Sequence, residues 1–560
     1  MQMKTDNKIT TKPLVIVGIV LITILLFCLV GCNNNVDNTP PTPNPPEPPH
    51  THSYNANGIC SCGQTRSIEV SLYIDGKYEK SIYTDSDCNY KITLPSTPED
   101  IRTNPNSERY FYGWFADPNF QTPVTNKTTF NTNTKIYAKW ITVYSNSFSY
   151  TVDYGKATIT GYVGGTPTVL VIPAFINSFP VKKIGVNAFE NETVIRTVII
   201  CDGIEEISGF KGCNSITEIS IPDSVKTIGE SCFEKCGFTK INIPDSVTTI
   251  KSRAFYGNRL TSFNAINVTS IEAEAFSKCY LLKNVEIPNV TYIGKSALEA
   301  CDFTKIDVPK VTFIDEYAFK HCENLTTINI PNVKTIGKSA FDFAGLTSIT
   351  LPNTLETIEE GVFHQCKFEE IIIPKSVKSI NYYAFARCKK LKKIVIPETV
   401  EFIGKEIFGD CTGLEVVTWP SNIKSIPNYT FSGCTNLRII NNFENINKIG
   451  NGAFIGCSSL GNISLPLNIT YIAQEAFYGC KNISMIIPSS VKSINGKAFY
   501  GCENLTLTIP KSVTYIGAMV FYKSKNVKIY YQGSESQWLN ISKGEKWKDW
   551  ATNLTITYEE

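Results

Sequence analysis

Histidine is scarce in this sequence, which holds only four histidines among 560 residues. That leaves little material for general acid–base catalysis or for a metal site with imidazole ligands. The sequence contains no G-x-S-x-G, no H-E-x-x-H and no glycine-rich phosphate loop, and His321 and His364 stand alone at polar positions. We therefore expect a protein that is not an enzyme, with no catalytic residue, no metal site and no cofactor.

An excess of charge is also missing. The formal net charge is +2, and the first 31 residues hold Lys4, Lys8, Lys12 and Asp6, so the chain from residue 32 onward is neutral. Nucleic acids and anionic membrane surfaces attract basic faces, so we expect no nucleic-acid partner. A length of 560 residues and a hydrophobic content of 42% instead indicate a folded chain of several domains or a repeat array.

The first 31 residues have the pattern of an export signal, with three lysines before the apolar run Leu14–Val30. The run ends in Leu29-Val30-Gly31-Cys32, which resembles the lipobox of bacterial lipoproteins. The resemblance implies that residues 1–31 are removed and that Cys32 carries the lipid anchor. The alternative is an uncleaved signal anchor, since about 17 apolar residues approach the roughly 20 that span a bilayer. Either way we expect an extracytoplasmic, membrane-anchored protein at the cell surface.

Residues 32–66 form a predicted stalk, because Asn33–Pro49 holds seven prolines among polar residues. Four possible metal ligands follow at His50, His52, Cys60 and Cys62. The C-x-C spacing departs from that of structural zinc sites, which favours a disulfide or free thiols.

Residues 67–142 predict a small β domain, with alternating apolar residues in Ile68–Ile74 and a turn at Asp75-Gly76. The motifs Phe111–Asp117 and Ile136–Trp140 resemble the Listeria–Bacteroides repeat, the internalin-type B repeat. The resemblance implies a β-grasp-like fold that serves as a spacer or interaction unit. For Trp114 and Trp140 we favour core packing over a ligand platform.

Residues 143–528 repeat one motif every 21 to 23 residues, and the copy Ala384–Gly404 shows it well. Ile394 and Ile396 alternate as in a strand, Pro397 ends that strand, and other apolar residues recur every three or four positions. One copy cannot bury its own apolar surface, so neighbouring copies are expected to stack, with a parallel sheet of short strands about 4.8 Å apart.

The repeat resembles the BspA-type, or Treponema-type, leucine-rich repeat. The resemblance implies a curved leucine-rich repeat solenoid at the cell surface, associated with adhesion to host matrix proteins and with cell contact. About sixteen copies would extend on the order of 75 Å. Residues 529–560 leave the period, carry Trp538, Trp547 and Trp550, and predict a C-terminal cap.

Most of the 19 cysteines belong to the repeat. Twelve lie three residues after the phenylalanine position: Cys213, Cys236, Cys279, Cys301, Cys322, Cys366, Cys388, Cys411, Cys434, Cys457, Cys480 and Cys502. Asn258, Ala344 and Ser524 take their place in other copies. Replacement by small neutral residues indicates an interior position, so we expect reduced, buried thiols.

The residue between the two inward-facing strand positions should point to solvent. The candidate partner-binding face consists of Glu286, Asp307, Asn329, Thr350, Ile372, Val395, Thr418 and Asn441. Ile372 and Val395, flanked by Glu370 and Lys393, form the best contact candidate. The alternative is that single apolar residues there only favour strand formation.

We therefore expect a monomeric surface lipoprotein that binds an extracellular protein or glycan through this face. A non-adhesive spacer or scaffold of the cell envelope is the main alternative. A substrate-capture lipoprotein is a third, and it would need a pocket or a metal site.

Overall fold

The computed structural model describes residues 69–83, 109–124, 128–130, 132–142 and 147–559. Cys32, the stalk and the His50–Cys62 segment lie outside the described residues, so the predictions made for them stay untested. Within the described ranges, no helix has the length and apolar character needed to cross a bilayer.

The N-terminal described unit is a mixed five-stranded sheet in the order β2-β1-β5-β3-β4. Its strands are β1 Glu69–Ile74, β2 Lys77–Tyr83, β3 Arg109–Phe115, β4 Pro123–Val124 and β5 Thr134–Thr142. β1 runs parallel to β5, whereas the other pairs are antiparallel. Trp114 is only 3% exposed and Trp140 packs against the same cluster, which confirms their predicted place in the core. The resemblance to the internalin-type repeat stays a prediction.

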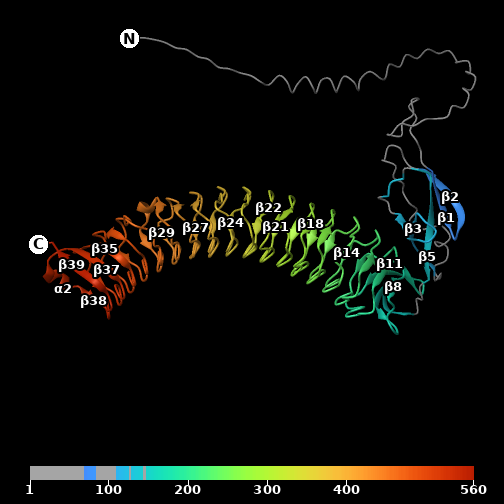
Figure 1. The fold of residues 1–560 in the computed structure, drawn as a ribbon, viewed down its shortest axis with the longest axis horizontal. Helices are drawn as coiled ribbons and strands as arrows, with labels where there is room; N and C mark the ends of the chain where they lie inside the picture. The colour runs from blue at the N-terminus through green and yellow to red at the C-terminus, as the bar shows by residue number, and fades with distance from the viewer. Residues whose placement is uncertain (1–68, 84–108, 125–127, 131, 143–146, 560) are drawn as a thin grey trace, which may run out of the picture. The chain divides into compact units, whose positions relative to one another are not determined.

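Residues 147–559 form a β-solenoid of about 17 turns with a spacing near 22 residues, which confirms the predicted fold class. It opens with the hairpin β6 Phe148–Asp153 and β7 Lys156–Tyr162, and Figure 1 shows the turns that follow as a curved row. Each turn passes through two lines of short parallel strands. The sequence pattern predicts only one of these lines.

The first strand line carries the Ile394–Ile396 pattern. Its strands are β8 Val169–Ile172, β11 Thr197–Ile200, β13 Glu218–Ser220, β16 Ser262–Asn264, β18 Asn284–Glu286, β20 Lys305–Asp307, β22 Thr327–Asn329, β26 Lys393–Val395, β28 Val416–Thr418, β30 Ile439–Asn441, β33 Ser484–Ile486, β35 Glu503–Pro510, β37 Lys525–Gln532 and β39 Thr552–Tyr558.

The second strand line follows β7 and consists mostly of two-residue strands that end in a buried isoleucine. Its strands are β10 Phe179–Ile184, β12 Glu206–Ile207, β14 Thr227–Ile228, β15 Thr249–Ile250, β17 Ser270–Ile271, β19 Tyr292–Ile293, β21 Phe313–Ile314, β23 Thr335–Ile336, β24 Thr357–Ile358, β25 Ser379–Ile380, β27 Phe402–Ile403, β29 Ser425–Ile426, β31 Lys448–Ile449, β32 Tyr471–Ile472, β34 Ser493–Ile494, β36 Tyr515–Ile516 and β38 Ser542–Lys543. The remaining elements are β9 Phe175–Ile176, the 3-10 helix η3 Phe443–Asn445 and α2 Glu535–Leu539.

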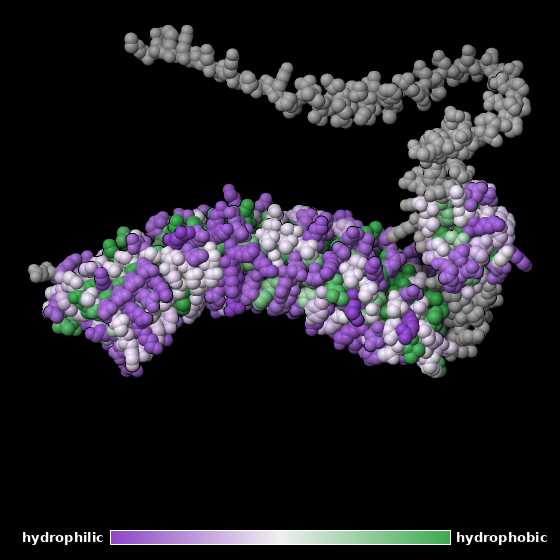
Figure 2. Space-filling model, in the orientation of Figure 1, coloured by the Kyte–Doolittle hydropathy of each residue, from purple (hydrophilic) through white to green (hydrophobic). Residues whose placement is uncertain are grey.

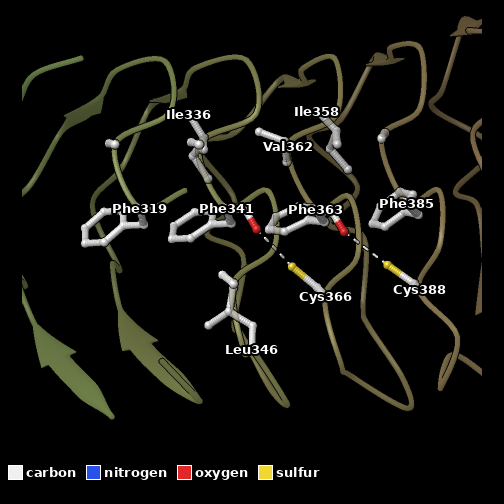
Figure 3. Close-up of a cluster of buried hydrophobic side chains, with 14 of the residues drawn as sticks. Phe319, Ile336, Phe341, Leu346, Ile358, Val362, Phe363, Cys366, Phe385 and Cys388 are labelled. Atoms are coloured by element: carbon white, nitrogen blue, oxygen red, sulfur yellow. Dashed lines mark hydrogen bonds between the residues drawn. The ribbon is translucent and has the colours of Figure 1, made fainter. Parts of the chain in front are cut away.

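The Ala-Phe segment forms the third side of each turn. The Phe363 ring stacks between Phe341 and Phe385, with ring centroids 5.9 and 5.7 Å away (Figure 3). The Phe363 amide also donates to the Ala384 carbonyl of the next turn at 2.9 Å. Neighbouring turns are therefore joined by apolar stacking and by backbone hydrogen bonds, so the core runs continuously along the array.

The first strand line is not one continuous sheet. Pairing with the preceding turn is absent at six places. One is between β30 and Asn462, where the loop Cys457–Leu460 has the regular length. The other five follow loops that are one residue shorter: residues 236–238, 258–260, 301–303, 344–346 and 366–368. At the fourth, Thr347 N still donates to Thr326 O at 3.0 Å, but Ser348–Leu351 does not join β22. At this turn the backbone is therefore hydrogen-bonded to the preceding turn next to the loop, and it is unpaired along Ser348–Leu351.

Residues 529–560, where the sequence predicts a cap outside the repeat period, continue both ladders. β38 pairs with β36 and β39 pairs with β37. Trp547 continues the phenylalanine row, with its ring 6.2 Å from Phe521, while the buried Trp538 of α2 contacts Tyr531 and Trp547. The segment is one further turn whose tryptophans also cover the core, except that Trp550 is 76% exposed.

Candidate functional site

The candidate face has the predicted orientation. Ile394 and Ile396 are buried, whereas Val395 between them is 60% exposed. Across the predicted set, Thr418 is half-buried and the other seven residues are exposed. The first strand line therefore presents one row of outward side chains from turn to turn, as the alternation of strand residues requires.

Six of the eight predicted residues lie within strands, and two do not. Thr350 and Ile372 occupy the turns in which Ser348–Leu351 and Ile371–Pro374 form no strand. Both turns follow shortened loops. The face is therefore ordered into paired strands on either side and has an interruption at its middle.

A groove of about 810 Å³ lies on this face. It crosses β18, β20, β22 and the strandless turn, and thus spans two of the breaks in pairing. Glu286, Asp307, Asn329 and Thr350 line it together, so the structure brings half of the predicted set into one concave site. Lys305, Thr327, Pro331 and Pro352 also line it, and the sequence analysis did not name them.

The polar side chains in and near the groove already bond to one another. The Asn329 amide donates to Asp307 at 2.7 Å, and the Asn264 amide donates to Glu286 at 2.9 Å. Such bonds fix the side chains at the spacing of the turns. The groove therefore presents ordered hydrogen-bond acceptors to a partner. Its own net charge is small, because Lys305 lies beside Glu286 and Asp307.

Farther along the face, opposite charges pair in successive turns. Lys392 lies 2.7 Å from Glu369 and Lys393 lies 3.0 Å from Glu370, while Arg438 pairs with Glu415. The hydrogen bond and charge of Lys392 lower the pKa of Glu369, and those of Glu369 raise the pKa of Lys392. Both groups are fully exposed, so water weakens the pair and it contributes little to stability.

The apolar spot predicted at Ile372 and Val395 is larger than the sequence analysis proposed. Val416 and Ile439 occupy the other outward position of β28 and β30, two residues before the positions named from sequence. Ile439 is 50% exposed and Val416 is half-buried. Considering both outward positions of every strand would have revealed these residues.

The repeat cysteines are free and buried, as predicted. Burial raises the pKa of Cys213, Cys279 and Cys411 to about 12, so these thiols stay protonated and unreactive. Each also donates to a carbonyl of the preceding turn; Cys388 Sγ lies 3.1 Å from Phe363 O (Figure 3). Ser524 Oγ makes the equivalent bond at 2.7 Å and Asn258 Nδ2 makes it to Phe233 O. The position usually holds a side-chain donor, which the sequence analysis did not infer, although Ala344 fills it without one.

His321 and His364 are not isolated, contrary to the sequence analysis, because stacking of the turns brings them to one place. The Phe343 ring lies 4.7 Å from the His321 ring and 5.7 Å from the His364 ring. His364 Nδ1 is 2.6 Å from Asp342 Oδ1. Among the described residues, no serine, threonine or cysteine side chain bonds to the His364 ring, so the pair lacks an adjacent nucleophile. In the same part of the chain, no group of three or more histidine, cysteine, aspartate or glutamate residues is placed to hold a metal ion.

Comparison with protein families matches the solenoid. Residues 208–326, 312–438 and 425–537 match the model described as "BspA type Leucine rich repeat region (6 copies)", and together these segments cover more than half of the chain. No curated protein matches the chain.

Solved structures give similar matches. A leucine-rich repeat protein from Bacteroides ovatus is 24% identical, with a TM-score of 0.52, over 74% of this chain and 98% of that one. A leucine rich cell surface protein from Faecalibacterium prausnitzii is 30% identical, with a TM-score of 0.38, over 71% of this chain and 96% of that one. The first supports the fold.

Proposed function

Because this chain belongs to the BspA-type leucine-rich repeat family, whose members are typically cell-surface proteins with a protein-interaction repeat fold, we propose that it is a surface adhesin. Its first strand line binds an extracellular protein or glycan of a host or of a neighbouring cell. The solenoid acts as a non-catalytic interaction scaffold.

The observation that carries this proposal is the outward row of side chains from Glu286 to Asn441. Its residues are ordered by the turns beneath them, and four of the eight line one groove. A rigid, regular surface lowers the conformational entropy that is lost on binding a large partner. The side of the solenoid that Figure 2 draws is mainly hydrophilic, as expected for a surface in contact with water.

The proposed attachment to the membrane is a lipid on Cys32, with residues 33–66 as the stalk. Support for this comes from the apolar run and its Gly-Cys ending in the sequence. Incorporation of labelled palmitate into the full-length chain, and its loss in Cys32→Ala, is the expected result. Label that persists in the variant would contradict lipid attachment at Cys32.

The binding proposal is tested by surface plasmon resonance of the full-length chain in detergent against matrix proteins, cell-surface glycans and glycosaminoglycans. Saturable binding that is weakened by the triple substitution Glu286→Gln, Asp307→Asn and Asn329→Ser, or by Ile372→Thr, is expected. Phe313→Ser and Phe402→Ser, which alter exposed apolar residues on the second strand line, serve as controls. Absence of binding across the panel would contradict adhesion and favour a spacer or scaffold of the envelope.

A further inference from the structure

We infer that the groove on the first strand line binds an extended segment of a protein partner, with an arginine or lysine side chain against Glu286 and Asp307. The inference rests on the proposed function and gives the partner a chemical class. The main chain of the segment bonds to the open edge of β22, and its basic side chain pairs with the two carboxylates. A backbone edge and two carboxylates, all without partners, lie together in this groove.

The backbone of β22 is open on the side of the next turn. Where neighbouring strands pair, the amide that follows the outward residue donates to the next turn: Ile396 N lies 3.0 Å from Thr418 O, and Ile487 N lies 2.9 Å from Thr508 O. Ile330 holds the same position after β22, and its amide has no hydrogen-bond acceptor among the described residues. Ile330 is 1% exposed and lines the groove. A buried amide without an acceptor costs free energy, which a carbonyl of the partner would recover.

The open edge has the pattern of groups that a polypeptide main chain complements. Asn329 O accepts from Val308 N of the preceding turn at 3.3 Å, so the groups of Ile328 point the other way, to the side where β22 has no strand partner. Ile328 and Ile330 line the groove on this side, and Thr350 lines it across the break. An extended peptide offers amides and carbonyls at the spacing of such an edge, about 6.8 Å from one pair to the next. A glycan carries hydroxyl groups without this order.

The two carboxylates are the only charges in the outward row from Glu286 to Asn441. Glu286 and Asp307 belong to neighbouring turns, and in the described part of the chain neither forms an ion pair with a lysine or arginine. Farther along the face, in contrast, Glu369, Glu370 and Glu415 each pair with a basic residue of the next turn. The groove therefore keeps two carboxylates that a partner can neutralise.

Two asparagine amides hold these carboxylates in place. Asn264 Nδ2 donates to Glu286 Oε2 at 2.9 Å, and Asn329 Nδ2 donates to Asp307 Oδ1 at 2.7 Å, which leaves lone pairs of both carboxylates free. Lys305 is the other charged residue of the groove, so two carboxylates and one ammonium leave one negative charge. Such a site attracts a basic side chain, and a planar guanidinium has enough donors to bond to both carboxylates.

The probe is a phage-displayed library of random peptides of about seven residues, which extend over about 24 Å as a strand. The library is selected on the full-length chain, and one enriched peptide is titrated by fluorescence anisotropy. A neutral copy of this peptide has citrulline in place of arginine, or acetyl-lysine in place of lysine. A second set of copies carries a methyl group on one backbone nitrogen at a time, which removes that N–H donor.

Two protein variants are compared with the native chain. The acid variant carries Glu286→Gln and Asp307→Asn, which remove both charges of the outward row. The control variant carries Glu370→Gln and Glu415→Gln, which remove the same number of charges beside the same strand line but outside the groove. Circular dichroism checks that both variants remain folded.

The enriched peptides are expected to carry an arginine or a lysine. The neutral copy on the native chain, and the parent peptide on the acid variant, should each bind at least about tenfold more weakly, whereas the control variant should change the affinity less than about twofold. Methylation should weaken binding at alternate residues, because every second amide of a strand faces its neighbour. A tenfold rise in ionic strength should weaken binding at least about threefold.

Four results would each overturn the inference. They are a library that yields no binder, enriched peptides without a basic residue, an acid variant that binds as tightly as the native chain, and methylated copies that all bind as tightly as the parent peptide.

Failure of this inference differs from failure of the proposed adhesion. If a matrix protein or a glycan binds the native chain and the acid variant equally well, adhesion stands and the basic segment falls. If no member of the panel binds but basic peptides bind the groove as described, the inference stands and the proposed panel of partners is wrong.

Discussion

At the scale of single residues, the cysteine of each repeat has two roles. It fills the core, and its thiol donates to a carbonyl of the turn before it. The backbone amide of Cys366 also donates to Phe363 O, so Cys388 satisfies the second lone pair of that oxygen. A purely apolar role would favour alanine over serine as a substitute, whereas a donor role favours serine.

Cys388→Ser is therefore expected to destabilise the protein less than Cys388→Ala. The hydroxyl retains the bond to Phe363 O, as Ser524 does to Phe499 O, and one such bond contributes about 1 kcal/mol. Urea unfolding followed by circular dichroism measures the difference. A higher stability of Cys388→Ala would show that the thiol acts only as an apolar group.

The buried thiols also predict a loss of stability in alkali. Burial raises the pKa of Cys322 and Cys411 from 9.0 to about 12. Between these values the unfolded chain loses thiol protons that the folded chain retains, so each rise in pH favours the unfolded chain. The urea midpoint should fall as the pH rises from 9.0, and it should fall less steeply in the double variant Cys322→Ser and Cys411→Ser. Equal slopes would contradict this account.

The sequence could predict that these positions are interior, because small neutral residues replace cysteine there. It could not reveal the donor role directly, since the acceptor lies one turn away and becomes a neighbour only when the turns stack. The pairing of Asp342 with His364, 22 residues apart in the sequence, escaped prediction for the same reason.

At the scale of elements, five of the six breaks in pairing along the first strand line follow a loop that is one residue shorter than the others, and the break after β30 does not. The loop Ala344–Leu346 is one residue shorter than Cys322–Leu325, and β22 has no strand partner on that side. The groove lies across this break. The concave part of the candidate site therefore coincides with a loop that is one residue short.

Inserting one asparagine after Gly345 is expected to restore pairing between β22 and Ser348–Leu351. The groove should become shallower, and the backbone amides of Thr327–Leu351 should exchange with solvent more slowly because new hydrogen bonds protect them. Hydrogen–deuterium exchange read by mass spectrometry measures this. Deleting Lys390, which shortens the regular loop Cys388–Leu391, should have the opposite effect at β26. Unchanged exchange in both variants would show that loop length does not set the pairing.

Part of the strand arrangement was predictable from the sequence. The alternation around Ile394 and Ile396 correctly gave the inward and outward sides. The second strand line was missed because its two-residue strands are too short to show an alternation. The breaks in pairing along the first strand line were not predicted. The sequence analysis treated a difference of one residue between copies as variation in the repeat spacing and did not consider its effect on strand hydrogen bonds.

At the scale of the whole molecule, repetition explains both stability and function. Each turn buries its apolar side against its two neighbours, so the core extends without a compact centre. The same repetition aligns outward residues from distant parts of the sequence into one face. The period of the repeat predicted this arrangement. Which partner binds depends on the few outward residues that differ from the common pattern of the repeat.

Attachment of living cells to beads that carry the full-length chain tests the central claim most directly. Three kinds of beads are counted on host cells and on neighbouring bacterial cells. They carry the native chain, a combined variant with Glu286→Gln, Asp307→Asn, Asn329→Ser and Ile372→Thr, or the second-line control with Phe313→Ser and Phe402→Ser. The account predicts attachment by the native chain and by the second-line control, and a loss of most attachment by the combined variant. Equal attachment by all three would show that the first strand line does not carry the binding.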